Sequence, residues 1–417
     1  MKFEFITNAC GIFYGSNGTK ILTDPWINNG VFEGSWFQYP EIKTKIEDLN
    51  KVDAIYLSHI HPDHYDERYF NFSKDIPLII LDEGPNFLKR NLIKQGYENF
   101  IMIKNNQTKK FKEFKLTMYK PFTGHIYEES ILGNLIDSAL VLADKKNVAI
   151  NFNDNTPNKK ACKFLAKKFK KIDLAMINYN AAGPYPSCFN NLTKKQKIKE
   201  SNRIIERNFN HLLDILPVLK PKGILPFAGS YIIAGKNYYK NDYLGNTTWD
   251  ACADYLKKNL KTKSKIICLR ENQKLNINTL KINGVYKRVN VKDKKNYLKK
   301  IKNIKYKYQL IKKPDSKKLE SDVLKAKLKL QDRLKKFRIN IKTNVYISLN
   351  KYKHIKIING TNKEMKLYCS MDDRLLRRIL DKTSHWNNAE IGTHINFVRK
   401  PNTMEPDAHT SLSFFHL

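Results

Sequence analysis

Four residues with metal-binding side chains follow a short apolar stretch near residue 55. The run from Ala54 to Leu57 has the length and composition of a buried strand, and it leads into His59, His61, Asp63 and His64. Imidazole and carboxylate groups are common ligands of metal ions in proteins. Four such groups in the spacing H-x-H-x-D-H, directly after a strand, predict a metal site.

The spacing also indicates how these four side chains divide. Residues two apart on an extended chain point to the same side, so His59 and His61 can bind one ion. Pro62 turns the backbone out of the strand, and Asp63 and His64 then point elsewhere. We expect these two to bind a second ion about 3.5–4 Å away, the separation found in two-metal enzymes. Asp63 is also the candidate catalytic residue, because it is placed to handle a proton.

Length and composition bound the kind of protein. A chain of 417 residues exceeds one ordinary hydrophobic core, so we expect two domains, or one large domain with an appendage. The net charge of +36 would fit nucleic acid, an anionic membrane or an anionic substrate. The excess is mostly lysine, accompanied by much asparagine and isoleucine, which a codon-biased genome also produces. We therefore expect an anionic small-molecule substrate and do not expect nucleic acid as a partner.

Six cysteines form neither a CxxC pair nor a dense framework, which favours free thiols in a reducing compartment. The first five residues lack the apolar core of a signal peptide, and no run reaches about 18 apolar residues. We expect no transmembrane segment and a cytoplasmic protein.

Strand and helix patterns around the motif predict an α/β protein. Apolar alternation and buried apolar runs predict strands at 2–7, 10–15, 75–81, 98–103, 114–119, 138–143, 148–152 and 174–180. Helical periodicity predicts helices at 86–95 and at 197–216, the second ended by Pro217. This alternation fits an αββα sandwich.

The histidine motif resembles the signature of the metallo-β-lactamase superfamily. Further stretches resemble the catalytic region of the CMP-N-acetylneuraminate hydroxylase family: Asp24-Pro25-Trp26, Asp154 with Pro157 and Asn158, 182–186, 226–229, 386–392, Arg399 and 414–416. The resemblance covers nearly the whole chain apart from the lysine-rich middle. It implies an α/β fold, the αββα metallo-β-lactamase sandwich, with a dinuclear metal site.

The resemblance implies three further site residues. His125, just after a glycine at a strand end, would be the third ligand of the first ion. Asp154 would bridge both ions, because its two oxygens can each reach a different cation. Asp24 would lie behind the histidine loop and orient it. Where many hydrolases of the superfamily carry a last histidine, this chain has Ala228, so the second ion has fewer protein ligands.

The narrower resemblance implies a non-haem iron oxygenase that is fed by a Rieske iron–sulfur domain and acts on a nucleotide sugar. A Rieske cluster needs two cysteines and two histidines, and the sequence contains no Cys-x-His pair. We therefore expect electrons from a separate electron-transfer protein or a cosubstrate. With zinc or manganese, the same ligands would support a hydrolase of a phosphodiester or lactone. A third hypothesis is a non-catalytic or nucleic-acid-binding protein that uses the basic surface.

We expect three parts in the chain. Residues 1–270 form the metal-binding domain, and 271–340 form a lysine-rich connecting region with an amphipathic helix from Leu319 to Phe337. Residues 341–417 alternate again and predict a small C-terminal α/β module, with strands at 344–349, 353–358 and 367–370 and a helix at 374–380. We expect this module to pack on the metal domain and close one side of the pocket.

Residues on predicted strand-end loops are the candidates for substrate binding: Asn180, Tyr185, Tyr231 and Lys236. Lys236 would hold a phosphate or carboxylate of the substrate. The later histidines are expected to be structural or to face the substrate rather than bind metal: His385, His394, His409 and His416.

Overall fold

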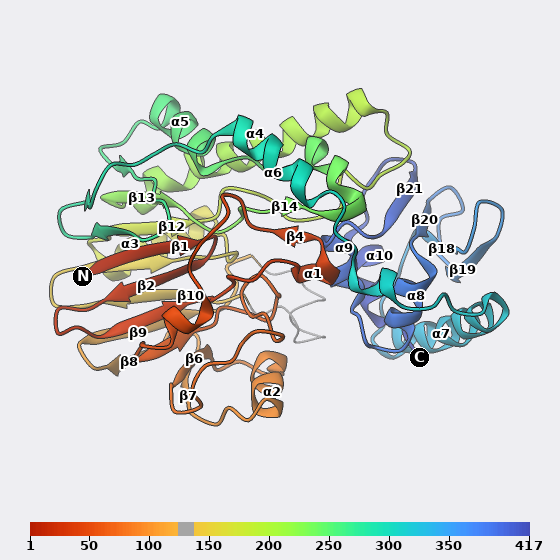
Figure 1. Ribbon diagram of the computed structural model, residues 1–417, viewed down its shortest axis with the longest axis horizontal. Coiled ribbons are helices and arrows are strands. Elements are labelled where there is room, and N and C mark those ends of the chain that lie inside the picture. The colour runs from red at the N-terminus through yellow and green to blue at the C-terminus, as the bar shows by residue number, and fades with distance from the viewer. Residues whose placement is uncertain (124–136) are drawn as a thin grey trace.

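Two β-sheets face each other across the metal domain (Figure 1). The computed structural model describes residues 1–123 and 137–417. Within these residues the first sheet has eight strands, in the order β17 (Lys281–Ile282), β16 (Gln273–Asn276), β1 (Lys2–Thr7), β2 (Cys10–Tyr14), β3 (Lys20–Thr23), β5 (Ala54–Tyr56), β6 (Leu78–Leu81) and β7 (Phe100–Ile103). The second has seven: β15 (Lys265–Ile266), β13 (Gly223–Pro226), β12 (Leu174–Ile177), β11 (Val148–Asn151), β10 (Ala139–Ala143), β9 (Phe114–Tyr119) and β8 (Thr108–Phe111).

The period-2 alternation of side chains explains how the sheets are layered. In β6, Ile79 and Leu81 belong to the apolar cluster between the two sheets, while Leu78 and Ile80 belong to the cluster on the outer face. All four are at most 3% exposed. A strand that is buried on both faces must be apolar throughout, which is why 78–81 reads as an uninterrupted apolar run.

Helices cover the outer face of each sheet. The outer cluster of the second sheet includes side chains from α3 (Lys159–Phe169), α4 (Lys194–Leu219) and α5 (Trp249–Asn259). The outer cluster of the first sheet includes Leu88 and Leu92 of α2 (Phe87–Lys94). The predicted αββα sandwich is therefore confirmed.

The predicted end of α4 is wrong. The helix continues through Pro217 to Leu219 instead of ending at Leu216. Proline removes one intrahelical hydrogen bond, but Leu216 and Leu219 on either side of it are at most 1% exposed against the second sheet. Their burial holds the last turn in helical form.

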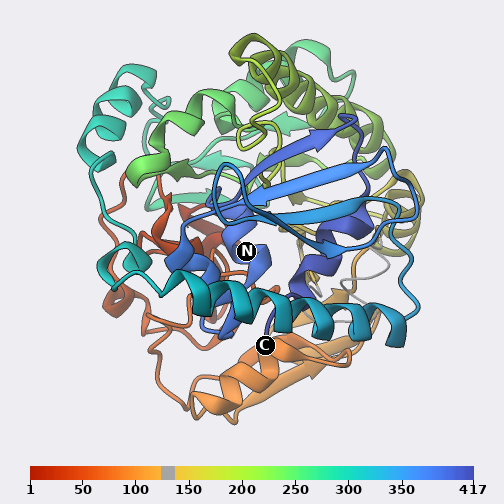
Figure 2. The same ribbon diagram turned by 90° about the vertical axis from the view of Figure 1, so that its right-hand side faces the viewer.

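The C-terminal part forms a second α/β unit (Figure 2). Its four-stranded sheet has the order β19 (His354–Ile358), β18 (Asn344–Ser348), β20 (Lys366–Ser370) and β21 (Asn396–Lys400). Figure 2 shows α7 (Ser316–Lys336) lying below this sheet. Shorter helices complete the unit: α8 (Asp373–Leu380), α9 (Trp386–Ile391), α10 (Pro406–Thr410) and the 3₁₀ helices η3 (Lys307–Leu310) and η4 (Ser411–Phe414).

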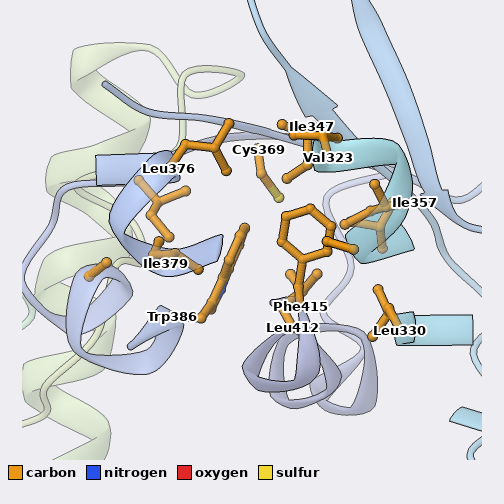
Figure 3. Close-up of a cluster of buried hydrophobic side chains, with 14 of the residues drawn as sticks. Val323, Leu330, Ile347, Ile357, Cys369, Leu376, Ile379, Trp386, Leu412 and Phe415 are labelled. Atoms are coloured by element: carbon orange, nitrogen blue, oxygen red, sulfur yellow. The ribbon is translucent and has the colours of Figure 1, made fainter. Parts of the chain in front are cut away.

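The amphipathic helix predicted at 319–337 is confirmed as α7. Its first turn is capped by Asp315, whose side chain accepts a hydrogen bond from the backbone N–H of Lys318. One face is buried in the core of the C-terminal unit, through Leu319, Val323, Ala326, Leu330 and Leu334. Figure 3 shows Val323 and Leu330 in this core. The lysines lie on the other face, as expected for a solvated helix with one packed side.

The lysine-rich region begins inside the first sheet. β16 pairs with β1 in antiparallel register, with Leu275 opposite Phe3. After β17, α6 (Val291–Ile301) packs through Tyr297 and Ile301 on Ile232 of β14 (Ile232–Ile233). β14 pairs with β4 (Trp36–Phe37) and leads into the 3₁₀ segment η2 (Gly235–Tyr243).

Polar contacts join the C-terminal unit to the metal domain. His394 Nε2 lies 2.9 Å from the backbone oxygen of Phe32, which belongs to the short turn α1 (Val31–Gly34). The buried Lys240 ammonium donates to the backbone oxygen of Thr393 at 2.7 Å. Figure 1 shows α1 and α9 side by side where the two parts meet. No helix in the described ranges is both long enough and apolar enough to cross a membrane.

Candidate metal centre

The histidine motif occupies the loop that follows β5. β5 lies between β3 and β6 in a parallel arrangement, so this loop is at the carboxyl edge of the first sheet. The backbone oxygen of His61 accepts hydrogen bonds from the N–H groups of His64 and Tyr65, both at 2.9 Å. This turn, which contains Pro62, folds Asp63 and His64 back beside the strand end.

Three imidazole rings converge in this loop. His59 Nε2 lies 2.9 Å from His61 Nδ1, and the ring centroids of His59 and His64 are 4.2 Å apart. Two ligand atoms that share an ion at about 2.1 Å lie roughly 3–3.5 Å apart. The spacing of the imidazoles therefore fits ligation of metal ions.

Carboxylates complete the cluster. His64 Nε2 lies 3.6 Å from Asp63 Oδ2 and 3.6 Å from Asp154 Oδ2. The ligand atoms of His59, His61 and Asp154 all lie within 4.8 Å of one another. Asp154 follows β11, and its Oδ1 accepts a hydrogen bond from Asn178 Nδ2 at 2.8 Å, which leaves Oδ2 facing His64. The structure thus brings the motif together with Asp154.

His64 supplies a direct sign that the site fits metal. Its ring is fully buried, yet Nε2 makes no hydrogen bond with any residue that the structure describes. The nearest carboxylate oxygens, on Asp63 and Asp154, lie 3.6 Å away, beyond hydrogen-bond distance, and these carboxylates also prefer a cation. An ion ligated by Nε2 would be a partner for this nitrogen and for the carboxylates around it.

Oxygen atoms hold the outward nitrogens of the three rings. His59 Nδ1 lies 3.0 Å from Ser58 Oγ, and His64 Nδ1 lies 3.0 Å from Asp24 Oδ2. Asp24 Oδ1 also accepts a hydrogen bond from the backbone N–H of Ser58 at 2.7 Å, so Asp24 lies behind the loop and orients it. The outward nitrogen of His61, Nε2, lies 3.0 Å from Oδ1 of Asn387 in α9. Such partners fix the orientation of metal-binding histidines.

Burial keeps two of the imidazoles neutral. It lowers the pKa of His59 well below its usual value and that of His61 to about 4. Neutral imidazole is the form that binds metal. Burial would also lower the pKa of His64, but the nearby Asp63, Asp24 and Asp154 outweigh it and raise this pKa.

The two carboxylates shift in opposite directions. Burial raises the pKa of Asp63 to about 7, and the neighbouring Asp154 adds to the effect. Burial would raise the pKa of Asp154 as well, but the adjacent His64 outweighs it and lowers this pKa. When the pKa values of two neighbouring carboxylates differ in this way, one can carry a proton while the other stays negatively charged.

A further carboxylate that the motif did not indicate lies at the site. Asp137 Oδ1 is 3.5 Å from His59 Nε2. The next residue, Ser138, donates from its N–H and its Oγ to the backbone oxygen of Ser58, which ties the start of β10 to the histidine loop. The available signal in the sequence was a carboxylate directly before a buried strand.

Two positions singled out in the sequence, 125 and 228, add no ligand among the residues that the structure describes. His125 lies outside the described residues, so its role as a third ligand stays a prediction. Ala228 follows β13 and is 2% exposed, so it contributes no ligand at this strand end.

Each predicted substrate residue has another partner in the fold. Asn180 donates to the backbone oxygens of Gly229 and Thr247, both at 2.8 Å. Tyr231 stacks on Trp36 with centroids 3.5 Å apart.

The other two candidates lie in similar contacts. Tyr185 donates to Glu200 Oε2 at 3.0 Å, and the Lys236 ammonium lies 3.6 Å from Asp372 Oδ2. Within the described ranges, none of the four candidates lines the cavity beside His61.

A cavity of about 900 Å³ opens beside His61, between the metal domain and the C-terminal unit. The turn α1 and the histidine loop line one side, and segments 382–388 and 413–416 line the other. His385 and His416 are among the lining residues. A cavity of this size suits a small-molecule ligand.

The rim of the cavity is rich in cations. Three cations that form no ion pair with any described residue line it: Arg90, Lys307 and Lys382. Glu67 is the one lining acid that likewise forms no ion pair with a described residue. The other charged lining residues pair with each other: Asp66 with Arg68 and Glu33 with Arg378.

Comparison with known sequences finds partial relatives. No family model matches the chain. It is 32% identical over 190 residues to a protein of Mycolicibacterium smegmatis named as a Rieske 2Fe-2S iron–sulfur protein, a match that covers 43% of this chain and 34% of the relative. It is 23% identical over 245 residues to the cytidine monophosphate-N-acetylneuraminic acid hydroxylase of Mus musculus, covering 56% and 39%. The chain thus matches between about a third and two fifths of the length of these relatives.

Solved structures with some likeness include CmlA, a diiron β-hydroxylase from Streptomyces venezuelae, at 15% identity and a TM-score of 0.43, covering 66% of this chain and 54% of that one. An isothiocyanate hydrolase from Delia radicum gut bacteria has 18% identity and a TM-score of 0.46, covering 66% and 99%. Two facing sheets with outer helices, and the H-x-H-x-D-H loop at the carboxyl edge of β5, give the chain the metallo-β-lactamase fold.

Proposed function

We propose that this protein is a metal-dependent enzyme, a hydroxylase-like non-haem iron oxygenase that acts on an anionic, sugar-like or nucleotide-linked small molecule. The observation that carries the proposal is the convergence of His59, His61 and His64 with Asp63 and Asp154 beside a cavity. The ligands are imidazoles and carboxylates without a thiolate, a set that suits iron. The names of the sequence relatives, a Rieske iron–sulfur protein and a hydroxylase, favour oxygen chemistry.

The proposed division of ligands follows the geometry. His59 and His61 would hold one ion, Asp63 and His64 the other, and Asp154 would lie between them. Iron bound there would supply the activation of dioxygen. Ala228 provides no imidazole for the second ion, so that ion would keep more positions open.

The protein's own groups would prepare the reaction. Ser58 and Asp24 hold the rings of His59 and His64 in place. Asp63, which lies beside His64 in the buried part of the site, would accept or donate a proton.

Electrons would come from a cluster that the residues of this sequence do not hold. The sequence contains no Cys-x-His pair, and its six cysteines are free thiols, five of them buried. A Rieske cluster needs both residue types as ligands. A partner carrying such a cluster, on a further stretch of the same polypeptide or on a separate protein, is the proposed source of electrons.

The cavity supports an anionic substrate. Arg90, Lys307 and Lys382 have no ion-pair partner among residues 1–123 and 137–417, and their positive charge at the rim attracts phosphate or carboxylate groups. Lys382 and Lys307 come from the C-terminal unit and Arg90 comes from the metal domain, so a substrate bound there would contact both parts.

A zinc- or manganese-dependent hydrolase is the second candidate. The donor set favours it, because imidazoles and carboxylates also suit zinc and manganese, and Asp63 would lie where it can take a proton from an attacking water. A phosphodiester or a lactone would be the substrate class.

Metal analysis followed by two assays separates these candidates. Protein purified without added metal is expected to contain iron and to consume oxygen when a chemical reductant and a redox mediator are supplied. A protein that contains zinc alone and hydrolyses bis(p-nitrophenyl) phosphate without oxygen would contradict the oxygenase and support the hydrolase. His59→Ala should abolish either activity, because it removes a ligand.

A further inference from the structure

We propose that Asn387 of α9 is a positioning residue of the metal centre, which selects the tautomer and the orientation of His61. The inference rests on the proposed function, because it assumes that His61 binds metal. It adds that the C-terminal unit supplies part of the metal-binding free energy, although it supplies none of the proposed ligands.

The contact is direct. Asn387 Oδ1 lies 3.0 Å from His61 Nε2, across 326 positions of sequence. The other ring nitrogen, Nδ1, lies 2.9 Å from His59 Nε2 at the centre of the cluster. One nitrogen of His61 therefore faces the C-terminal unit and the other faces the proposed ion.

The chemistry of the two groups fixes the tautomer. A neutral imidazole carries one hydrogen, and an amide oxygen only accepts hydrogen bonds. Because Oδ1 of Asn387 faces Nε2, the hydrogen lies on Nε2 and the lone pair of Nδ1 points to the centre. The reversed amide would donate to Nε2 and move the hydrogen to Nδ1, which then could not bind metal. Metal binding at Nδ1 and the observed amide orientation thus require each other.

The residues that precede Asn387 hold it in this position through contacts with both parts of the protein. The preceding residue, Trp386, is 1% exposed and meets Phe415 edge to face, with centroids 6.1 Å apart (Figure 3). Two residues earlier, Ser384 donates to Glu33 Oε1 of α1 at 2.7 Å. The segment is therefore anchored in the C-terminal core and tied to the metal domain, so the amide is already in place before metal binds.

The neighbouring residue provides a matched control. Asn388 also lines the cavity and lies in α9, but its side chain forms no hydrogen bond with any described residue. Replacing either asparagine with leucine removes an amide of similar size from the same helix. Only the change at 387 removes a partner of His61.

Cobalt binding by the full-length protein tests the inference. The affinity is measured by competition with a chelator, and the ligand field is read from the visible absorption of bound Co²⁺. We expect Asn387→Leu to weaken Co²⁺ binding 10–100-fold and to shift its absorption, since loss of such a partner usually has this effect. Asn388→Leu should match the unmodified protein in both measurements.

Asn387→Asp is a second variant, which retains a hydrogen-bond acceptor for His61 and serves if the leucine variant folds poorly. The carboxylate still accepts from Nε2, so Co²⁺ affinity should equal or exceed that of the unmodified protein. Unchanged affinity and spectrum in Asn387→Leu would overturn the inference, and so would an equal loss in Asn387→Asp and Asn387→Leu. Failure of the unmodified protein to bind Co²⁺ would instead overturn the proposed function.

Discussion

The metal centre has an interior side and a cavity side, and the two are built differently. On the interior side, His64 is fully buried, and its outward nitrogen contacts Asp24 and Ser58 of the same domain. On the cavity side, His61 is partly exposed, and its outward nitrogen contacts Asn387 of the other unit. The interior side is thus set by the metal domain alone, whereas the cavity side depends on how the C-terminal unit docks.

The largest expected effect comes from the interior side. His64→Ala removes a proposed ligand and leaves the buried Asp24 without its imidazole. We therefore expect at least one ion fewer per chain and a loss of roughly 1–3 kcal/mol in the free energy of unfolding. Metal analysis and chemical denaturation measure the two effects. His354→Ala, at the exposed first residue of β19, is the control. Full metal content in His64→Ala would mean that His64, on the interior side, does not bind metal.

Asp24→Asn sharpens the comparison without removing a ligand. The amide keeps the size of the side chain but loses the negative charge beside His64 Nδ1. We expect metal affinity to fall about 10–100-fold, the usual cost of losing such a partner. Chelator competition on this variant and on Asn387→Leu ranks the two sides. Equal losses would show that the C-terminal unit matters as much as the metal domain's own aspartate.

The docking of the C-terminal unit should depend on pH through His394. Burial lowers the pKa of this residue to about 3, whereas an unfolded histidine has a pKa of about 6.5. Between these values the unfolded state binds more protons. The stability from neutral His394 is therefore fully present above pH 6.5 and is lost as the pH falls toward 3.

Replacing His394 with glutamine should flatten this dependence. We expect the loss in the free energy of unfolding between pH 7 and pH 4.5 to be smaller by roughly 1–2 kcal/mol than in the unmodified protein. Urea titrations at each pH measure this loss, with His354→Gln as the control at the exposed first residue of β19. Parallel pH profiles for His394→Gln and the unmodified protein would contradict the expectation.

The smallest effect is expected at the cavity rim. Lys382→Glu reverses an exposed charge, so a nucleoside monophosphate should bind roughly fivefold more weakly, a difference of about 1 kcal/mol. Calorimetry at low and high salt measures the affinity, and the difference should shrink at high salt. Lys356→Glu, on β19 and outside the cavity lining, should leave binding unchanged.

The sequence predicted those parts of the protein whose signal is local. The predicted strand at 114–119 matches β9, and the predicted helix at 374–380 lies within α8, because each has a clear apolar period. The six-residue histidine motif likewise carries its chemistry within one loop. Such features need no knowledge of what lies across the fold.

Contacts between distant segments left no comparable signal. Asn387 and Asp137 reach the site only through the docking of α9 and the start of β10. Tyr231 and Lys236 were predicted on strand-end loops at the rim of the site, but they contact Trp36 of β4 and Asp372 of the C-terminal unit instead. The prediction considered only which loops follow strands, so it could not include contacts that the C-terminal unit makes with those loops.

The pairing of β1 with β16 has a consequence for synthesis on the ribosome. Lys2 lies opposite Asn276, so one edge of β1 stays open until most of the metal domain has been translated. At about 5–20 residues per second this takes roughly 15–50 s. An uncovered strand edge is a template for association with other chains. Nascent chains stopped before residue 273 should therefore be the most prone to aggregate, and translation past β16 should relieve that tendency.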